Sequence, residues 1–248
     1  MTAMGAHVDP TILPADAAGP AEAFARRLQG AAPREVIAAA AEGFSGRIAA
    51  VSSFGTESAV LLHMIAEVAP ALPVIFLDTG MLFPETLAYR DELVARLGLT
   101  DVRSIAPDPA EKAARDPDDA LWSENPDACC AVRKVMPLAR ALAPFAAWIN
   151  GRKRYQAATR NSIPMAEADG ARVKFNPLAD FTRADIEAYM AAHGLPHHPL
   201  EKFGFASIGC MPCTSRVKPG EDPRSGRWRG QAKTECGIHM PITPDIVL

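Results

Sequence analysis

Apolar segments of strand length alternate with segments of helical periodicity along this sequence, and that alternation limits its possible folds more than any other feature. The segment RIAAVSSF, residues 47–54, reads as a buried strand, and apolar residues recur at helical spacing over 60–68. PVIFLDTG, residues 73–80, reads as a second strand, and residues 84–98 form a second helical pattern with Pro84 at the first turn.

The same alternation continues toward the C-terminus. We expect strands over 101–107, 146–153 and 173–178, and a helical stretch over 129–143. A further helix is expected after Thr182, which has the side chain of an N-cap, and it should end at Gly194. Strands that alternate with helices predict an α/β fold, a mainly parallel sheet flanked by helices.

Charge and hydropathy exclude some classes of partner. The formal net charge of the 248 residues is −3, which gives no reason to expect nucleic-acid or membrane binding. The apolar runs are far shorter than the roughly 20 residues of a membrane span. The N-terminal residues lack the pattern of a secretory signal, so we expect a cytoplasmic protein whose thiols are reduced.

The five cysteines therefore point to metal binding or catalysis rather than to disulfides. Cys129 and Cys130 are adjacent, and Cys210 and Cys213 form the motif CMPC. Four thiolates can hold a structural zinc ion or a 4Fe–4S cluster, and the alternative is two small buried apolar side chains plus a chance pair.

Cys236 is left over from those pairs. The preceding segment, residues 214–233, has six basic and two acidic residues, a local charge of +4, and several Gly and Pro residues. We interpret it as a mobile basic loop, next to which a thiol becomes a better nucleophile. A surface thiol without a function is the alternative.

Two loops should lie where a parallel sheet binds ligands, at the carboxyl ends of its strands. One is SSFGTES, residues 52–58, whose hydroxyls and backbone N–H groups suit an anion, and the other is LDTG, residues 77–80. The first loop lacks the GK[ST] ending of a Walker A motif.

Taken together, these motifs resemble the bacterial assimilatory adenylyl-sulfate reductases, relatives of the phosphoadenylyl-sulfate reductases. The resemblance covers about residues 40–240 and includes the CC and CMPC pairs, KTECGIH at 233–239, GRKRYQAATR at 151–160 and LPHHPLEKFGFASIGCMPCT at 195–214. It implies a fold similar to that of the adenine-nucleotide α-hydrolases. The Ser-Gly-Gly-x-Asp-Ser loop of ATP pyrophosphatases is altered here, because Phe54 replaces a Gly and Glu57 the Asp.

The resemblance also implies a reaction. Cys236 would attack the sulfur of adenosine 5′-phosphosulfate (APS), AMP would leave, and thioredoxin or glutaredoxin would release sulfite from the S-sulfocysteine. It implies a 4Fe–4S cluster on Cys129, Cys130, Cys210 and Cys213, and substrate-binding roles for Lys134, Arg224, Arg227, Ser52, Ser53, Gly55, Ser58, Gly151 and Arg160. We hypothesise that the cluster positions Lys134, four residues beyond Cys130.

Several alternatives stay open at this point. The substrate could instead be the 3′-phosphorylated form (PAPS), and the chain could be an ATP-dependent adenylating or sulfur-transfer enzyme or a zinc module. The oligomeric state is open, homo-oligomers included. We divide the chain into a disordered tail (1–20), a nucleotide- and cluster-binding α/β domain (21–213) and a flexible C-terminal segment that carries the nucleophile (214–248).

Overall fold

A computed structural model of the chain describes residues 17–240. The sheet has six strands in the order β3-β2-β1-β4-β6-β5. The strands are β1 (Ile48–Ser52), β2 (Val74–Leu77), β3 (Val102–Ile105), β4 (Ala147–Ile149), β5 (Ala166–Asp169) and β6 (Arg172–Phe175). All neighbours are parallel except β5, which pairs antiparallel with β6. The predicted α/β fold with a mainly parallel sheet is confirmed.

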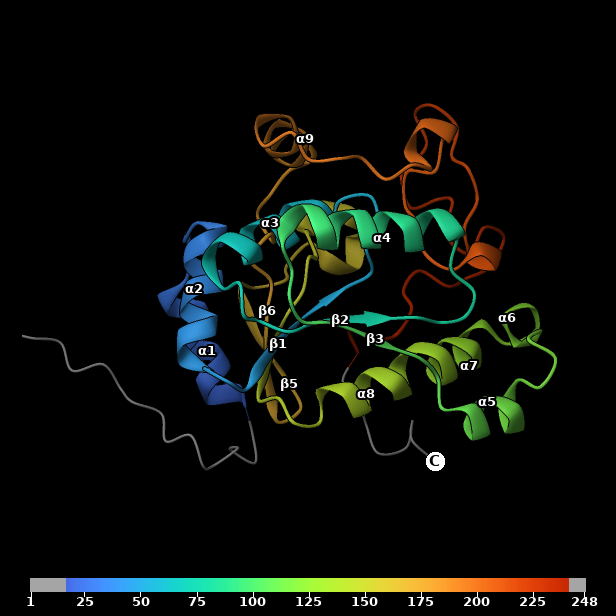
Figure 1. Ribbon diagram of the computed structural model, residues 1–248, viewed down its shortest axis with the longest axis horizontal. Helices are drawn as coiled ribbons and strands as arrows, with labels where there is room; N and C mark the ends of the chain where they lie inside the picture. The colour runs from blue at the N-terminus through green and yellow to red at the C-terminus, as the bar shows by residue number, and fades with distance from the viewer. Residues whose placement is uncertain (1–16, 241–248) are drawn as a thin grey trace, which may run out of the picture.

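Helices cover both faces of this sheet (Figure 1). They are α1 (Ala18–Arg27), α2 (Pro33–Gly43), α3 (Ser58–Val68), α4 (Pro84–Leu97), α5 (Pro109–Arg115), α6 (Leu121–Glu124), α7 (Pro126–Cys130), α8 (Met136–Leu142) and α9 (Arg183–Ala192). Alternate residues of each central strand enter different cores, since side chains of a strand point to opposite faces. Ala50 and Phe76 pack with α3 and α4, whereas Val51, Ile75 and Trp148 pack with α8.

The helical stretch predicted over 129–143 has an unexpected turn. Between α7 and α8 the chain forms a π-helix, Ala131–Val135, which contains Lys134. The spacing of four residues from Cys130 to Lys134 is therefore not the single α-helical turn that we expected. Such π-turns widen a helix locally and are frequent at functional sites.

The ends of the chain correct or limit two predictions. Most of the predicted tail, residues 1–20, lies outside the described residues. However, α1 begins at Ala18, so residues 18–20 are helical and do not belong to a disordered tail. Residues 241–248 of the C-terminal segment also lie outside, and residues 214–240 are described below in contact with the α/β domain. The boundary at residue 213 and the mobility of this segment stay predictions.

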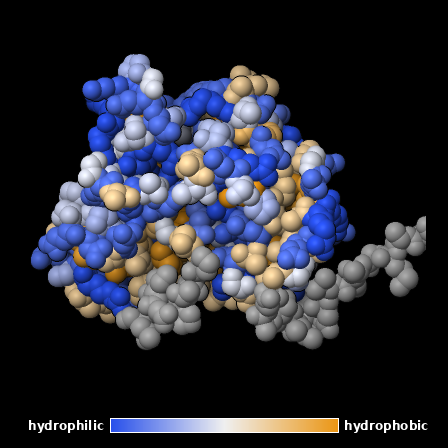
Figure 2. Space-filling view, turned by 180° about the vertical axis from the view of Figure 1, so that it is seen from behind, coloured by the Kyte–Doolittle hydropathy of each residue, from blue (hydrophilic) through white to orange (hydrophobic). Residues whose placement is uncertain are grey.

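Within residues 17–240, no helix combines the length and the apolar character that crossing a membrane requires. On the face opposite to that of Figure 1, hydrophilic residues surround small separate apolar patches (Figure 2).

The buried His198 makes the fold sensitive to acid. Its Nδ1 accepts a hydrogen bond from the backbone N–H of Leu200 (3.2 Å), and its Nε2 donates to the Thr86 hydroxyl (3.0 Å). Burial lowers the pKa of His198 to about 4. Between the unfolded pKa of about 6.5 and this value, only the unfolded chain takes up the proton, so acid favours unfolding.

We therefore expect the free energy of unfolding to fall by about 3 kcal/mol from this group as the pH drops from 7 to 4. The variant His198→Gln should lose that part of the pH dependence, whereas the exposed neighbour variant His197→Gln should keep it. Urea unfolding at several pH values measures both. Equal pH dependence in wild type and His198→Gln would contradict the assignment.

Candidate functional site

The strand order creates a crevice at one edge of the sheet. From β1 the chain crosses to β2 and β3 on one side, whereas β4 lies on the other side of β1. The order of a doubly wound sheet reverses at such a point, and ligands bind beyond the carboxyl ends of the strands there. A cavity of about 220 Å³ lies at this position, lined by the loop after β1 and the loop after β4.

The structure brings every predicted substrate-binding and catalytic residue to this one cavity. Its lining includes Ser52, Ser53, Gly55, Ser58, Lys134, Gly151, Arg160, Arg224, Arg227 and Cys236. They come from four parts of the chain, and what each of them does stays a prediction. The four paired cysteines do not line the cavity and lie next to it, as the contacts of Lys134 below show.

The loop after β1 is held in a conformation that suits an anion. Phe54 has φ of 48°, in the left-handed region that disfavours residues other than glycine, and its buried ring packs on Phe76 at 5.4 Å. The Phe54 backbone N–H also donates to the Ser52 hydroxyl (3.2 Å). This turn leads directly into α3, whose N-terminus favours negative charge.

Glu57 of the same loop is fully engaged by protein partners. Its carboxylate accepts hydrogen bonds from Lys153 (2.7 Å), Tyr155 (2.5 Å) and Gln156 (2.8 Å). Burial would raise the pKa of Glu57, but the charge and hydrogen bond of Lys153 and the other donors hold it below its ordinary value. Glu57 therefore joins the loops after β1 and β4, a role that the sequence analysis missed.

The segment that carries Cys236 is docked beside the sheet. Gly237 has φ of 86°, which lets the chain turn directly after the cysteine. Ile238 packs on the core below β1 and β2, and the ring of His239 stacks on Trp148 with a centroid distance of 5.7 Å. Lys174 donates to the His239 carbonyl (3.2 Å). These contacts hold the half-buried Cys236 against the cavity.

Glu235 forms the strongest contact of this segment with the cavity. Its two carboxylate oxygens accept hydrogen bonds from Nε and Nη2 of Arg160, both at 2.7 Å, and one of them lies 3.3 Å from Arg224. Burial would raise the pKa of Glu235, but Arg160, Arg224 and Arg152 lower it below its ordinary value. The Glu235 carboxylate thus pairs with Arg160 and Arg224, two of the arginines that were predicted to bind the anionic substrate.

Arg227 links the cavity to the CMPC motif. Its Nε donates to the Cys213 carbonyl (3.2 Å), and Thr214 and Arg227 form an antiparallel bridge. The guanidinium lies over Gly209, where a Cβ atom would overlap it. A larger residue at position 209 would therefore displace the Arg227 guanidinium from its present place.

The paired cysteines come together around Lys134. Cys129, Cys130 and Cys210 are buried and Cys213 is half-buried. Burial raises the pKa of Cys129 to about 12 and that of Cys130 to about 11. Burial also opposes ionisation of Cys210, but Lys134 and the Thr79 hydroxyl, 3.2 Å from its sulfur, lower the pKa of this thiol. Lys134 itself has its pKa raised, against the effect of burial, by Cys210, Cys236 and Cys130.

The spacing of these sulfurs bears on which group they fit. Tetrahedral zinc with bonds of 2.3 Å places thiolate sulfurs about 3.8 Å apart. Among residues 17–240, no three cysteine sulfurs lie within 4.8 Å of one another, although the four cysteines converge from α7 and from Met211–Cys213. By their donor chemistry, four thiolates can hold either a zinc ion or a 4Fe–4S cluster.

Two other arginines near the motifs are engaged by protein partners. Arg133, adjacent to Lys134, is buried and donates to Asp116 and to the Thr79 carbonyl (2.8 Å). Arg152 lines the cavity but was not among the predicted binding residues, and its side chain pairs with Glu167. Neither pairing has a sequence signal, since each joins residues at least 15 positions apart.

Comparisons with known proteins agree with one another. Residues 47–216 match the family model described as the phosphoadenosine phosphosulfate reductase domain. The chain is 60% identical over 209 residues to adenosine 5′-phosphosulfate reductase of Mesorhizobium japonicum, covering 84% of this chain and 82% of that protein. It is 46% identical to phosphoadenosine 5′-phosphosulfate reductase of Gloeobacter violaceus, covering 88% of this chain and 92% of that protein.

Solved structures show the same fold. The phosphate complex of phosphoadenylyl-sulfate reductase from Candida auris superposes with a TM-score of 0.67 at 28% identity, over 79% of this chain and 96% of that chain. The FMN adenylyltransferase of Candida glabrata, in complex with FMN and an ATP analogue, reaches a TM-score of 0.52 at 15% identity, over 83% and 79% of the two chains. The predicted adenine-nucleotide α-hydrolase-like fold is confirmed.

The position of Glu235 predicts how the cavity responds to anions. The variant Glu235→Gln removes a negative charge from Arg160 and Arg224, so it should bind inorganic sulfate about three- to tenfold more tightly at low ionic strength, with less gain in high salt. Isothermal titration calorimetry at two salt concentrations measures this.

Glu221→Gln is the matched control for that variant. Glu221 pairs with Arg229 in the same segment but does not line the cavity. If both variants bind sulfate as the wild type does, Glu235 does not occupy the anion site.

Proposed function

The chain belongs to the phosphoadenosine phosphosulfate reductase domain family, and we propose that it reduces APS to sulfite and AMP through an S-sulfocysteine on Cys236. The observation that carries this proposal is the position of one thiol, Cys236, in the same cavity as Lys134, Arg224 and Arg227. A nucleophile beside several cations is what attack on a doubly anionic phosphosulfate requires.

In the first step, the Cys236 thiolate attacks the sulfur of APS. A sulfur–sulfur bond forms, the bond from sulfur to the bridging oxygen breaks, and AMP leaves with that electron pair. Lys134, Arg224 and Arg227 offset the charge on the sulfonate and phosphate oxygens. Ser52, Ser53, Gly55 and Ser58, together with Gly151 and Arg160, bind the nucleotide in this proposal.

In the second step, a dithiol reductant releases sulfite. One of its thiolates attacks Sγ of Cys236, sulfite leaves, and a mixed disulfide forms. The second thiol of the reductant then closes its own disulfide and returns Cys236 as a thiolate. The two electrons come from the dithiol, for which thioredoxin or glutaredoxin in the reducing cytoplasm is suitable.

We assign Cys129, Cys130, Cys210 and Cys213 as ligands of a 4Fe–4S cluster. When bound, the cluster supplies local electrostatics rather than electrons, because the dithiol already balances the reaction. Lys134 interacts electrostatically with Cys130 and Cys210 of the ligand set and with Cys236, so in this proposal the ligand residues fix where its charge faces the substrate.

A second candidate substrate is PAPS, which differs by a 3′-phosphate. It is supported by the relative from Gloeobacter violaceus, which carries the name phosphoadenosine 5′-phosphosulfate reductase. An ATP-dependent adenylating enzyme is less well supported, since Glu57 stands in the loop position of the pyrophosphatase Asp and is occupied by Lys153. A zinc module would leave Cys236 without a role.

Sulfite release, measured with thioredoxin and either APS or PAPS, tests the proposal. We expect turnover with APS in the wild type and none above background in Cys236→Ser. Turnover with PAPS alone would change the substrate and keep the chemistry. Pyrophosphate release from ATP, with no sulfite from either substrate, would contradict the proposal.

The assigned role of Lys134 predicts a separation of activity from cluster content. Lys134→Ala should lose about a hundredfold or more in turnover, because it removes a cation from the site of charge development. Its iron content should match that of the wild type. Arg140→Ala is the control, since Arg140 pairs with Glu111 on the outer side of the same helical stretch. Parallel loss of iron and activity in Lys134→Ala would point to a structural role instead.

A further inference from the structure

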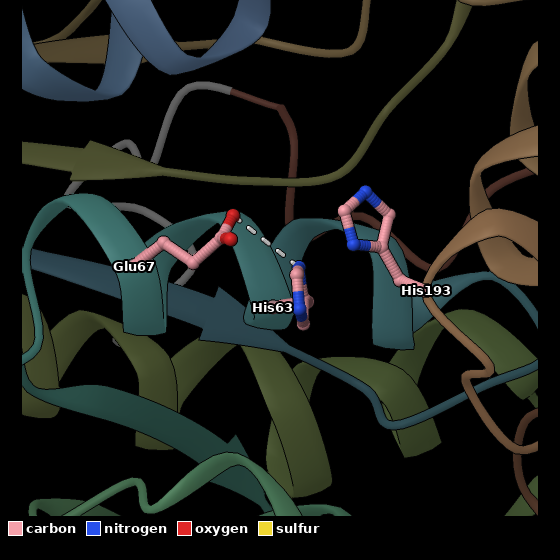
Figure 3. Close-up of side chains that lie close together, drawn as sticks. All are labelled: His63, Glu67 and His193. Atoms are coloured by element: carbon pink, nitrogen blue, oxygen red, sulfur yellow. Dashed lines mark ion pairs between the residues drawn. The ribbon is translucent and has the colours of Figure 1, made fainter.

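A second cluster of metal-binding side chains lies away from the cavity. His63 and Glu67 are four residues apart on α3, and His193 follows the last residue of α9 (Figure 3). None of the three lines the cavity that contains Cys236. Their donor atoms all lie within 4.8 Å of one another, the only such group of three among the described residues.

We propose that His63, Glu67 and His193 form a site for a divalent transition-metal ion of the zinc class, which joins α3 to the C-terminal end of α9. Two imidazole nitrogens and a carboxylate oxygen are a common donor set for zinc with an open fourth position. The site is independent of the proposed reductase chemistry, because none of its residues belongs to the cavity or to the cysteine pairs.

The donor atoms need to move only slightly closer together to hold one ion. Nδ1 of His63 lies 3.4 Å from Oε2 of Glu67, close to the separation of about 3.3 Å between donors on a tetrahedral zinc ion. The Tyr189 hydroxyl lies 2.9 Å from the same Nδ1 of His63, so an ion would replace this hydrogen bond, while Glu67 and His193 are exposed enough to change rotamer. The centroids of the two imidazole rings lie 4.6 Å apart, and the ring planes are tilted by 47°.

Arg34 is the competitor for the site. It forms an ion pair with Glu67 and donates to the Tyr189 hydroxyl (2.7 Å), so its guanidinium occupies one side of the carboxylate. The Arg34 side chain is 41% exposed, which allows it to move into solvent when an ion enters. Because an exposed pair of this kind is weak, Arg34→Ala should tighten metal binding by about two- to fivefold.

Calorimetric titration of Zn²⁺ into the reduced, tag-free protein under anaerobic conditions tests the site. The cysteines also bind zinc, but they are the same in every variant, so their contribution cancels in the comparison. We expect Glu67→Gln and His193→Ala to bind one equivalent less than the wild type. Both residues are exposed, and circular dichroism verifies that the variants are folded.

His197→Ala is the matched control. His197 and Glu201 form another histidine–glutamate pair four residues apart, 3.1 Å between their donor atoms, but no third donor completes a group there among residues 17–240. This variant should bind as many equivalents as the wild type. The proposal would be overturned if Glu67→Gln and His193→Ala bound Zn²⁺ with the stoichiometry and affinity of the wild type. It would also be overturned if His197→Ala lost Zn²⁺ binding to the same extent as those two variants.

Discussion

The reversal of strand order at β1 is the constraint on which the site depends. The chain connections that lead to β2 and to β4 run to opposite sides of β1. Their helices therefore do not cover the carboxyl end of this strand, and a crevice stays open there. The loop 52–58 and the loop after β4 meet in this crevice, and the ion pair of Glu57 with Lys153 joins them. The α/β domain thus supplies part of the cavity lining, with hydroxyl and backbone N–H groups of a kind that suits an anion.

Charge balance then determines how the C-terminal segment docks. Arg160 and Arg224 would repel each other in an empty cavity, and the carboxylate of Glu235 compensates both. The same contact brings the adjacent Cys236 to the cavity. A substrate with phosphate and sulfonate oxygens competes for the same guanidinium groups, which links substrate binding to the position of the nucleophile in our proposal.

The local patterns of the sequence predicted the fold, and they pointed to residues that the structure brings to one cavity and whose roles stay predictions. Continuous apolar runs predicted β1 and β2, and the cysteine pairs indicated the residues that converge around Lys134. Sequence reasoning missed β5 (Ala166–Asp169), because an edge strand with two polar positions has no apolar run. It also missed the contact of Glu235 with Arg160, since an ion pair between residues 75 positions apart leaves no periodic signal. No local motif of the sequence signals the π-turn at Ala131–Val135.

Intact mass spectrometry of the reduced, anaerobically purified protein after mixing with APS alone tests the central claim most directly. The account predicts a gain of one sulfonate, located by peptide mapping on the peptide that contains Cys236 and removed by thioredoxin. No adduct with APS or PAPS, or an adduct on another cysteine, would contradict the claim that Cys236 is the nucleophile of this cavity.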